Sequence, residues 1–147
     1  MRDMLLKTRL FGEIKVKEEE VINFTKPILG FDDCTQYILM ERESIFPTFW
    51  LQSVNNPGLA FPVISPFSIN EDYSIKLHTH DLDDIQLKDI NDVLVMTLMV
   101  VPQSMSSIRT NLRAPIIYNP EKKVAKQLIL RDEKYPIHYY IIDQANN

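Results

Sequence analysis

The chain alternates apolar and polar residues with a period of two, and this pattern restricts what it can fold into. In residues 10–17, one face carries Leu10, Gly12, Ile14 and Val16, whereas the other carries Phe11, Glu13, Lys15 and Lys17. Successive side chains of a β-strand point to opposite faces, so this alternation predicts a half-buried strand.

Comparable segments recur along most of the 147 residues and are separated by turn-forming sequences such as NNPG. We predict strands in residues 18–24, 36–42, 46–53, 59–65, 73–77, 93–101 and 135–143, and a hairpin in residues 110–130. The run VLVMTLMVV has no polar face, so we expect a central strand covered on both sides. Pro47 and Pro62 are expected near an edge or a bulge, because proline cannot donate a ladder hydrogen bond.

One segment has a helical pattern, HDLDDIQLKDI at residues 80–90. Its first turn would hold three acidic residues, where the helix dipole favours negative charge: Asp81, Asp83 and Asp84. Leu82 and Ile85 would pack inward. Strand after strand with one short helix predicts an all-β, mainly antiparallel sandwich or barrel, formed by residues 1–147 as a single domain.

The composition narrows the functional classes. With 45% hydrophobic and 24% charged residues, a wholly disordered chain is excluded. The formal net charge of −4 disfavours general binding to nucleic acids or membrane surfaces. Cys34 is the only cysteine, so no internal disulfide can form. No signal peptide pattern is present, and the longest apolar run is too short to span a membrane, so we expect a cytoplasmic protein.

Residues that could support catalysis or hold a metal do not form a clear set. His78 and His80 would share one face of a strand close to several aspartates, an arrangement that can bind zinc, but His138 is distant in sequence. We interpret the two as a solvated strand end that leads into the helix. The carboxylates lie in charge-rich segments that we expect to be exposed, and the negative charge of the aspartates beside Cys34 disfavours a reactive thiolate. We therefore expect no enzymatic activity, metal or cofactor.

The hairpin TNLRAPIIYNPEKKVAKQLIL carries most of the basic residues in the second half of the chain. With Arg109 just before the hairpin and Tyr118 nearby, these could form a patch for nucleic acid. We favour another interpretation, in which Lys122 and Lys123 lie in a solvated turn. Lys126 would then lie on an edge strand, where a charge discourages edge-to-edge pairing.

Several segments together resemble the bacterial flagellar assembly factor family, FliW. They are FGEI, INFTKPILGF, FWLQSVNNPGLAFPVISPF, DVLVMTLMVV and NLRAPIIYNPEKKVAKQLIL, and they occur in this order over nearly the whole chain. Each segment alone is weak evidence, whereas the combination of LQS…AF with NLRAPI…KQLIL is specific.

The resemblance implies a small β-barrel or split-barrel-like protein that acts without catalysis, by exchanging protein partners. Members of the family bind flagellin, and they also bind the RNA-binding regulator CsrA and relieve its repression of flagellin translation. Flagellin and CsrA are therefore the expected partners, with no direct contact to nucleic acid or membrane.

For a partner-binding surface, the segment LAFPVISPF at residues 59–67 is the best candidate. If Phe61 and Val63 face the core, the residues between and after them form an apolar strip with an acidic rim. The alternative is that a second layer or the C-terminal tail covers this strip. The candidate residues are Pro62, Ile64, Pro66 and Phe67, the rim residues Glu71 and Asp72, and Tyr118 and Asn119 as outlying candidates.

A rival interpretation comes from another class of protein. Split barrels of this length also bind flavin mononucleotide and act as oxidoreductases. In this chain, Arg109 or Arg113 together with Thr110 and Ser107 would hold the phosphate. The few glycines offer little to build an anion-binding loop.

Overall fold

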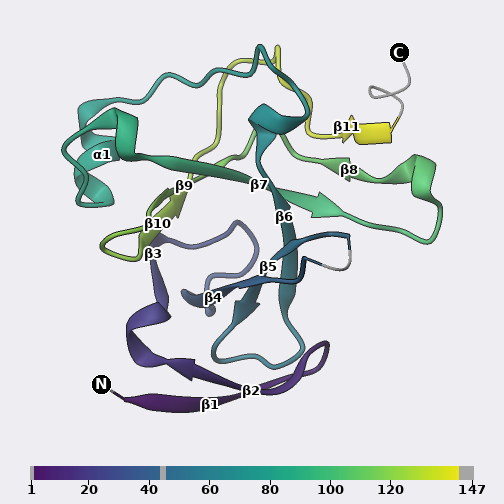
Figure 1. Cartoon of the computed structure of the whole chain (residues 1–147). Coiled ribbons are helices and arrows are strands. Elements are labelled where there is room, and N and C mark those ends of the chain that lie inside the picture. The colour runs from purple at the N-terminus through teal and green to yellow at the C-terminus, as the bar shows by residue number, and fades with distance from the viewer. Residues whose placement is uncertain (1, 44–45, 143–147) are drawn as a thin grey trace.

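The computed structural model describes residues 2–43 and 46–142, and most of its strands form a closed barrel (Figure 1). The seven barrel strands are β3 (Ile22–Lys26), β4 (Gln36–Glu41), β5 (Phe49–Ser53), β6 (Ala60–Ile64), β7 (Leu94–Val100), β9 (Ile116–Asn119) and β10 (Val124–Gln127). They pair in the order β7-β6-β5-β4-β3-β10-β9, and β9 pairs with β7 to close the ring. All of these pairs are antiparallel except β3–β10. The expected all-β, mainly antiparallel fold is confirmed.

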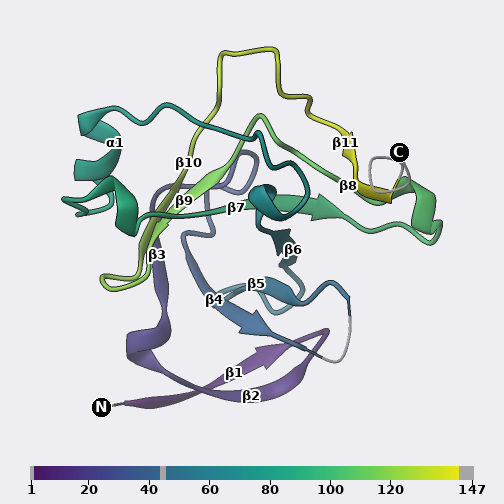
Figure 2. The same ribbon diagram turned by 45° about the horizontal axis from the view of Figure 1, so that its top comes forward.

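The remaining elements lie outside the barrel wall (Figures 1 and 2). The strands β1 (Asp3–Thr8) and β2 (Gly12–Lys17) form a separate hairpin, while β8 (Arg109–Thr110) and β11 (Tyr139–Tyr140) extend the sheet beyond β7. The helix α1 is short, Thr79–Asp84. Single 3₁₀ turns occupy Glu18–Glu20, Pro66–Ser68, Ile90–Asp92 and Met105–Ser107. Within the described residues, no helix has the length and apolar character needed to cross a bilayer.

Apolar side chains from every barrel strand fill the interior. This core consists of Ile22, Phe24, Ile28, Tyr37, Leu51, Val63, Met96, Ile116, Tyr118 and Ala125. Each fully buried aliphatic side chain of this kind contributes about 1.5–3 kcal/mol. Phe61 and Cys34 are partly buried and pack against the same core. The alternation predicted for the segment 59–65 is therefore present, with Phe61 and Val63 facing inward.

The hairpin of β1 and β2 forms a second layer on the barrel. Its Leu6 and Val16 pack against Ile38 and Met40, which point outward from β4. The sequence pattern predicted β2 but missed β1. Residues 3–8 do alternate, with Leu6 and Thr8 buried, but charges and the exposed Leu5 obscure the pattern.

The strand predicted at residues 73–77 is wrong, although its alternation is real. Tyr73 is buried, and Ile75 and Leu77 are half-buried, yet this segment pairs with no described strand. It is held by side chains instead: the hydroxyl of Tyr73 donates to the carbonyl of Leu112 at 2.8 Å, and the N–H of Ser74 donates to the hydroxyl of Tyr135 at 2.8 Å. Inward-facing residues thus recur at every second position, although no β-ladder hydrogen bonds join this segment to a described strand.

Candidate protein-binding surface

The outward face of β6 carries the apolar strip expected from the sequence. Pro62 lies opposite Trp50 of β5, and Ile64 lies opposite Thr97 of β7. Both Pro62 and Ile64 are half-buried. Pro62 pairs on its β5 side, whereas pairing with β7 begins only at Val63, so proline lies where one side of the strand needs no donor.

A 3₁₀ turn follows β6 and turns one aromatic ring toward solvent. The hydroxyl of Ser68 donates to the carbonyl of Ser65 at 2.7 Å and closes this turn. Phe67 is 45% exposed, and its ring meets Tyr73 edge-on with centroids 5.7 Å apart. Pro66 is buried and therefore contributes to the turn rather than to the surface.

Glu71 and Asp72 lie on the turn that leads away from Phe67, and both are exposed. The side chain of Asn70 accepts a hydrogen bond from the N–H of Asp72 at 3.1 Å, and the hydroxyl of Tyr135 donates to the Asp72 carbonyl at 3.4 Å. These bonds fix the backbone and leave both carboxylates directed to water. We call Pro62, Ile64, Phe67, Glu71 and Asp72 the β6 strip.

Tyr118 and Asn119 are buried, with 3% and 2% of their surface exposed. Tyr118 belongs to the barrel core. The side-chain amide of Asn119 donates to the carbonyls of Ile85 and Gln86 at 2.9 and 3.2 Å. Both side chains make contacts inside the protein, so neither residue belongs to the candidate binding surface.

The four residues of the flavin interpretation take part in hydrogen bonds within the chain. Arg113 donates through Nε to the carbonyl of Tyr135 at 2.8 Å, and Nη1 of Arg109 donates to the carbonyl of Ser107 at 3.1 Å. The hydroxyl of Thr110, which is 1% exposed, lies 2.7 Å from the Leu98 carbonyl. This geometry favours structural roles over phosphate binding.

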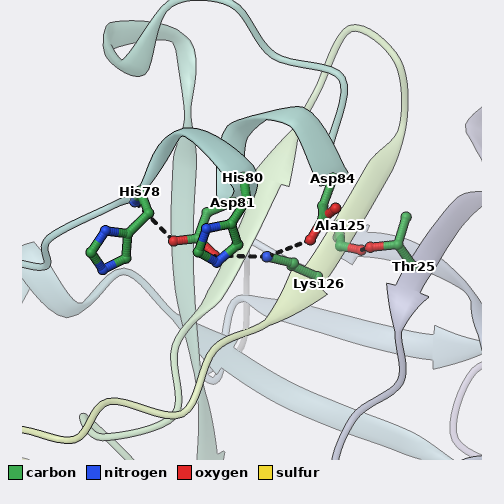
Figure 3. A network of polar contacts seen from close by, with 7 residues as sticks. All are labelled: Thr25, His78, His80, Asp81, Asp84, Ala125 and Lys126. Atoms are coloured by element: carbon green, nitrogen blue, oxygen red, sulfur yellow. Dashed lines mark hydrogen bonds and ion pairs between the residues drawn. The ribbon is translucent and has the colours of Figure 1, made fainter.

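Sequence reasoning missed a buried ion-pair network between α1 and β10 (Figure 3). The ammonium of Lys126 lies 2.7 Å from Oδ1 of Asp81 and 2.8 Å from Oδ2 of Asp84. Its side chain is 1% exposed, against 7% for Asp81 and 40% for Asp84. The expectation of Lys126 on an exposed edge strand is therefore wrong, because β10 lies between β3 and β9 in the closed barrel.

The two histidines lie at the start of α1, beside this network. The His78 and His80 rings are stacked with centroids 5.5 Å apart, and Nε2 of His80 lies 3.3 Å from Oδ1 of Asp81. The backbone N–H of His78 donates to Oδ2 of Asp81 at 2.9 Å. One carboxylate thus joins the first turn of the helix to Lys126.

The network shifts the pKa values of its members. Burial opposes ionisation of Asp81, but hydrogen bonds from Lys126 and the His78 backbone outweigh it and lower the pKa. The hydrogen bond from Lys126 also lowers the pKa of Asp84. Burial likewise opposes the charge on Lys126, yet its two carboxylate partners raise the pKa of the ammonium. All three groups are therefore ionised at neutral pH.

These shifts predict how stability depends on pH. The contribution of the lowered aspartate pKa values is complete above about pH 4, the ordinary value, and is lost as the pH falls through the folded-state values. The contribution of Lys126 is complete below about pH 10 and is lost as the pH rises through its raised value. Urea unfolding should show a steeper loss of stability below about pH 4 for the natural chain than for the Asp81→Asn variant. Equal acid slopes would contradict this assignment.

Comparisons with known proteins agree with this architecture. The profile of the family described as FliW protein matches residues 5–141. The flagellar assembly factor FliW of Alkaliphilus metalliredigens is 38% identical over 142 residues, covering 96% of this chain and 88% of that protein. The flagellar assembly factor FliW of Ruminiclostridium cellulolyticum is 39% identical and covers 96% of both chains.

A solved structure extends the similarity to three dimensions. A crystal structure of the flagellar assembly factor FliW superposes with a TM-score of 0.86 at 32% identity, over 94% of this chain and 96% of that chain. The profile match, the relatives and the shared fold each cover nearly the whole chain. The chain therefore belongs to the FliW family of flagellar assembly factors.

Proposed function

We propose that this FliW family member binds flagellin and the translational regulator CsrA in the cytoplasm, one at a time, and acts without catalysis. The observation that carries the proposal is the match to FliW over nearly the whole chain, in sequence and in fold. A match limited to a few core strands would support a shared fold but not a shared function.

The physical basis of the regulation is mass action. A factor shared by two mutually exclusive partners reports the free concentration of the one it binds. When flagellin is abundant it occupies the factor, and CsrA is free to repress flagellin translation. When free flagellin is scarce, the factor binds CsrA and relieves repression. The net charge of −4 favours encounter with a basic RNA-binding partner.

Calorimetry with purified flagellin and CsrA from the same cell tests the proposal. We expect binding to each partner alone, and displacement of CsrA when flagellin is added to the preformed complex. Binding to neither partner would refute the proposal, and a stable ternary complex would refute the exchange.

We further propose that the β6 strip contacts a protein partner. It combines an exposed aromatic ring with a carboxylate rim on a rigid strand and turn. Aromatic side chains with a polar rim are typical of protein interfaces. Strand β6 pairs with β5 on one side and β7 on the other. Pro62 and Ile64 are therefore already ordered before a partner binds, and binding costs less conformational entropy.

Replacing Ile64 by aspartate should weaken partner binding at least about tenfold while the protein stays folded. A charge in the centre of an apolar contact loses burial and leaves a carboxylate desolvated. Calorimetry measures the affinity, and circular dichroism with urea unfolding measures the fold.

The matched control is Ile129→Asp, which places the same charge at another isoleucine, 58% exposed and outside the strip. This control should bind normally. If Ile64→Asp unfolds the protein, Ile64 is core, and the exposed Phe67→Ala then decides whether the strip binds a partner.

A further inference from the structure

The barrel wall has an incomplete edge at β4. Strand β4 pairs with β5 along its whole length, but it pairs with β3 only at Tyr37 and Gln36. Beyond that point β3 leads back through the turn Glu18–Glu20 into β2, which forms the separate hairpin layer. Residues 38–41 therefore have a strand neighbour on one side only among the described residues.

The hydrogen bonds between β4 and β5 show which main-chain N–H and C=O groups of β4 point toward the open edge. The N–H of Arg42 donates to the carbonyl of Thr48, and the carbonyl of Gln36 accepts from the N–H of Val54. Hydrogen-bonding direction alternates along an antiparallel pair, so Leu39 and Glu41 turn their main-chain groups away from β5. The carbonyl of Glu41 accepts from Nη1 of Arg42 at 3.1 Å. Within the described residues, no strand pairs with the remaining main-chain groups of Leu39 and Glu41.

An open groove of about 370 Å³ runs along this edge. The β4 wall is formed by residues 38–40, and the opposite wall by residues 14–16 of β2. Ile14 and Val16 belong to the apolar layer between hairpin and barrel. An occupant that paired with β4 would therefore place alternate side chains against an apolar wall.

The charges of the groove differ between its ends. Arg42 follows the last residue of β4, and its guanidinium lies 4.9 Å from the centroid of the Phe11 ring. Glu20 lines the groove at the other end, where Ile22 pairs with Tyr37 and β3 separates from β4. A segment that ran antiparallel to β4 would meet a cation near its own N-terminal end and a carboxylate near its C-terminal end.

We propose that the β4 edge binds an extended segment of a protein partner by strand addition. The segment runs antiparallel to β4, carries alternating apolar residues, and has an acidic residue first and a basic residue last. Main-chain hydrogen bonds to Leu39 and Glu41 supply affinity, while the apolar wall and the two charged ends select sequence and direction. This surface is distinct from the β6 strip and gives the protein a second type of contact.

Two capped hexapeptides of identical composition test the proposal. One has the order Glu-Val-Thr-Val-Thr-Lys, and the other has its terminal charges exchanged. Nuclear magnetic resonance of the ¹⁵N-labelled full chain, titrated with each peptide to millimolar concentration, should show the largest shifts at the amides of Leu39 and Glu41. The Glu-first peptide should bind roughly three- to tenfold more tightly, since two exposed ion pairs contribute modestly.

The charge-exchanged double variant Glu20→Lys/Arg42→Glu should reverse this preference. A second double variant, Glu19→Lys/Arg9→Glu, alters the same charge types at exposed positions that do not line the groove and should keep the natural preference. The absence of shifts at Leu39 and Glu41 with both peptides would overturn the proposed site. A preference for peptide order that is the same in all three proteins would overturn the role of the two charged ends.

Discussion

Lys126→Ala is expected to lower the free energy of unfolding by about 3–5 kcal/mol, because it leaves the carboxylate of Asp81 buried without its partner. The side chain of Asp81 is 7% exposed, so water cannot replace the lost ammonium without rearrangement. Solvent reaches Asp84 more easily, since its side chain is 40% exposed. Urea unfolding at neutral pH measures the loss.

Two further variants separate charge from packing. The double variant Lys126→Met/Asp81→Leu removes the two buried charges and keeps apolar volume, so it should recover part of the stability that Lys126→Ala loses, although the N–H of His78 loses its acceptor. Lys122→Ala, at an exposed position of the hairpin turn, should change stability by less than about 0.5 kcal/mol. A loss below about 1 kcal/mol for Lys126→Ala would show that the ion pair is not buried as described.

Asn119→Ala is expected to destabilise the protein by about 2–3 kcal/mol, because one buried amide satisfies backbone groups of two separate segments. Its nitrogen donates to carbonyls of residues 85 and 86, and its oxygen accepts from the N–H groups of residues 121 and 122 at 3.1 and 3.3 Å. Each of these segments also contains a left-handed residue: φ is 58° at both Gln86 and Lys123. Such conformations persist only where surrounding contacts hold them. Thermal or urea unfolding measures the effect.

The control for Asn119 is Asn56, whose side chain accepts from the N–H of Gly58 at 3.0 Å in an exposed turn. Asn56→Ala should cost less than about 1 kcal/mol, because water replaces the lost acceptor. If Asn119→Ala weakened partner binding without loss of stability, Asn119 would be a contact residue after all.

Local patterns predicted those parts of the fold that depend on neighbours in sequence. The central strand in residues 93–101 follows from an apolar run without a polar face, and the hairpin in residues 110–130 follows from two apolar segments around an Asn-Pro turn. The short helix follows from Leu82 and Ile85 at helical spacing, and Ile85 is fully buried. In each case the sequence pattern and the element that it predicts lie in the same short segment.

Features that join distant segments could not be predicted in this way. Lys126 and Asp81 are 45 residues apart, and nothing beside either residue shows that the two meet in the interior. A lysine in a strand is ordinarily exposed, so local reasoning assigned it to an edge. The burial of Tyr118 and Asn119 likewise depends on α1 and the barrel core. The alternation on β6, with Phe61 and Val63 facing the core, was accessible to prediction because it is local, whereas partner binding by the β6 strip stays a prediction.

The parallel pairing of β3 with β10 determines the order in which the strands can pair during synthesis. Asn23 pairs with Val124, and the hydroxyl of Thr25 lies 3.5 Å from the carbonyl of Ala125, 100 residues later. Strands β3 to β7 follow one another and can pair as they leave the ribosome, whereas β3 has no second neighbour until residues 124–127 have been synthesised. A nascent chain that stops earlier carries an open sheet with an unpaired edge, the form most prone to aggregate. Closure of the ring therefore depends on residues 124–127, which bring the second neighbour of β3.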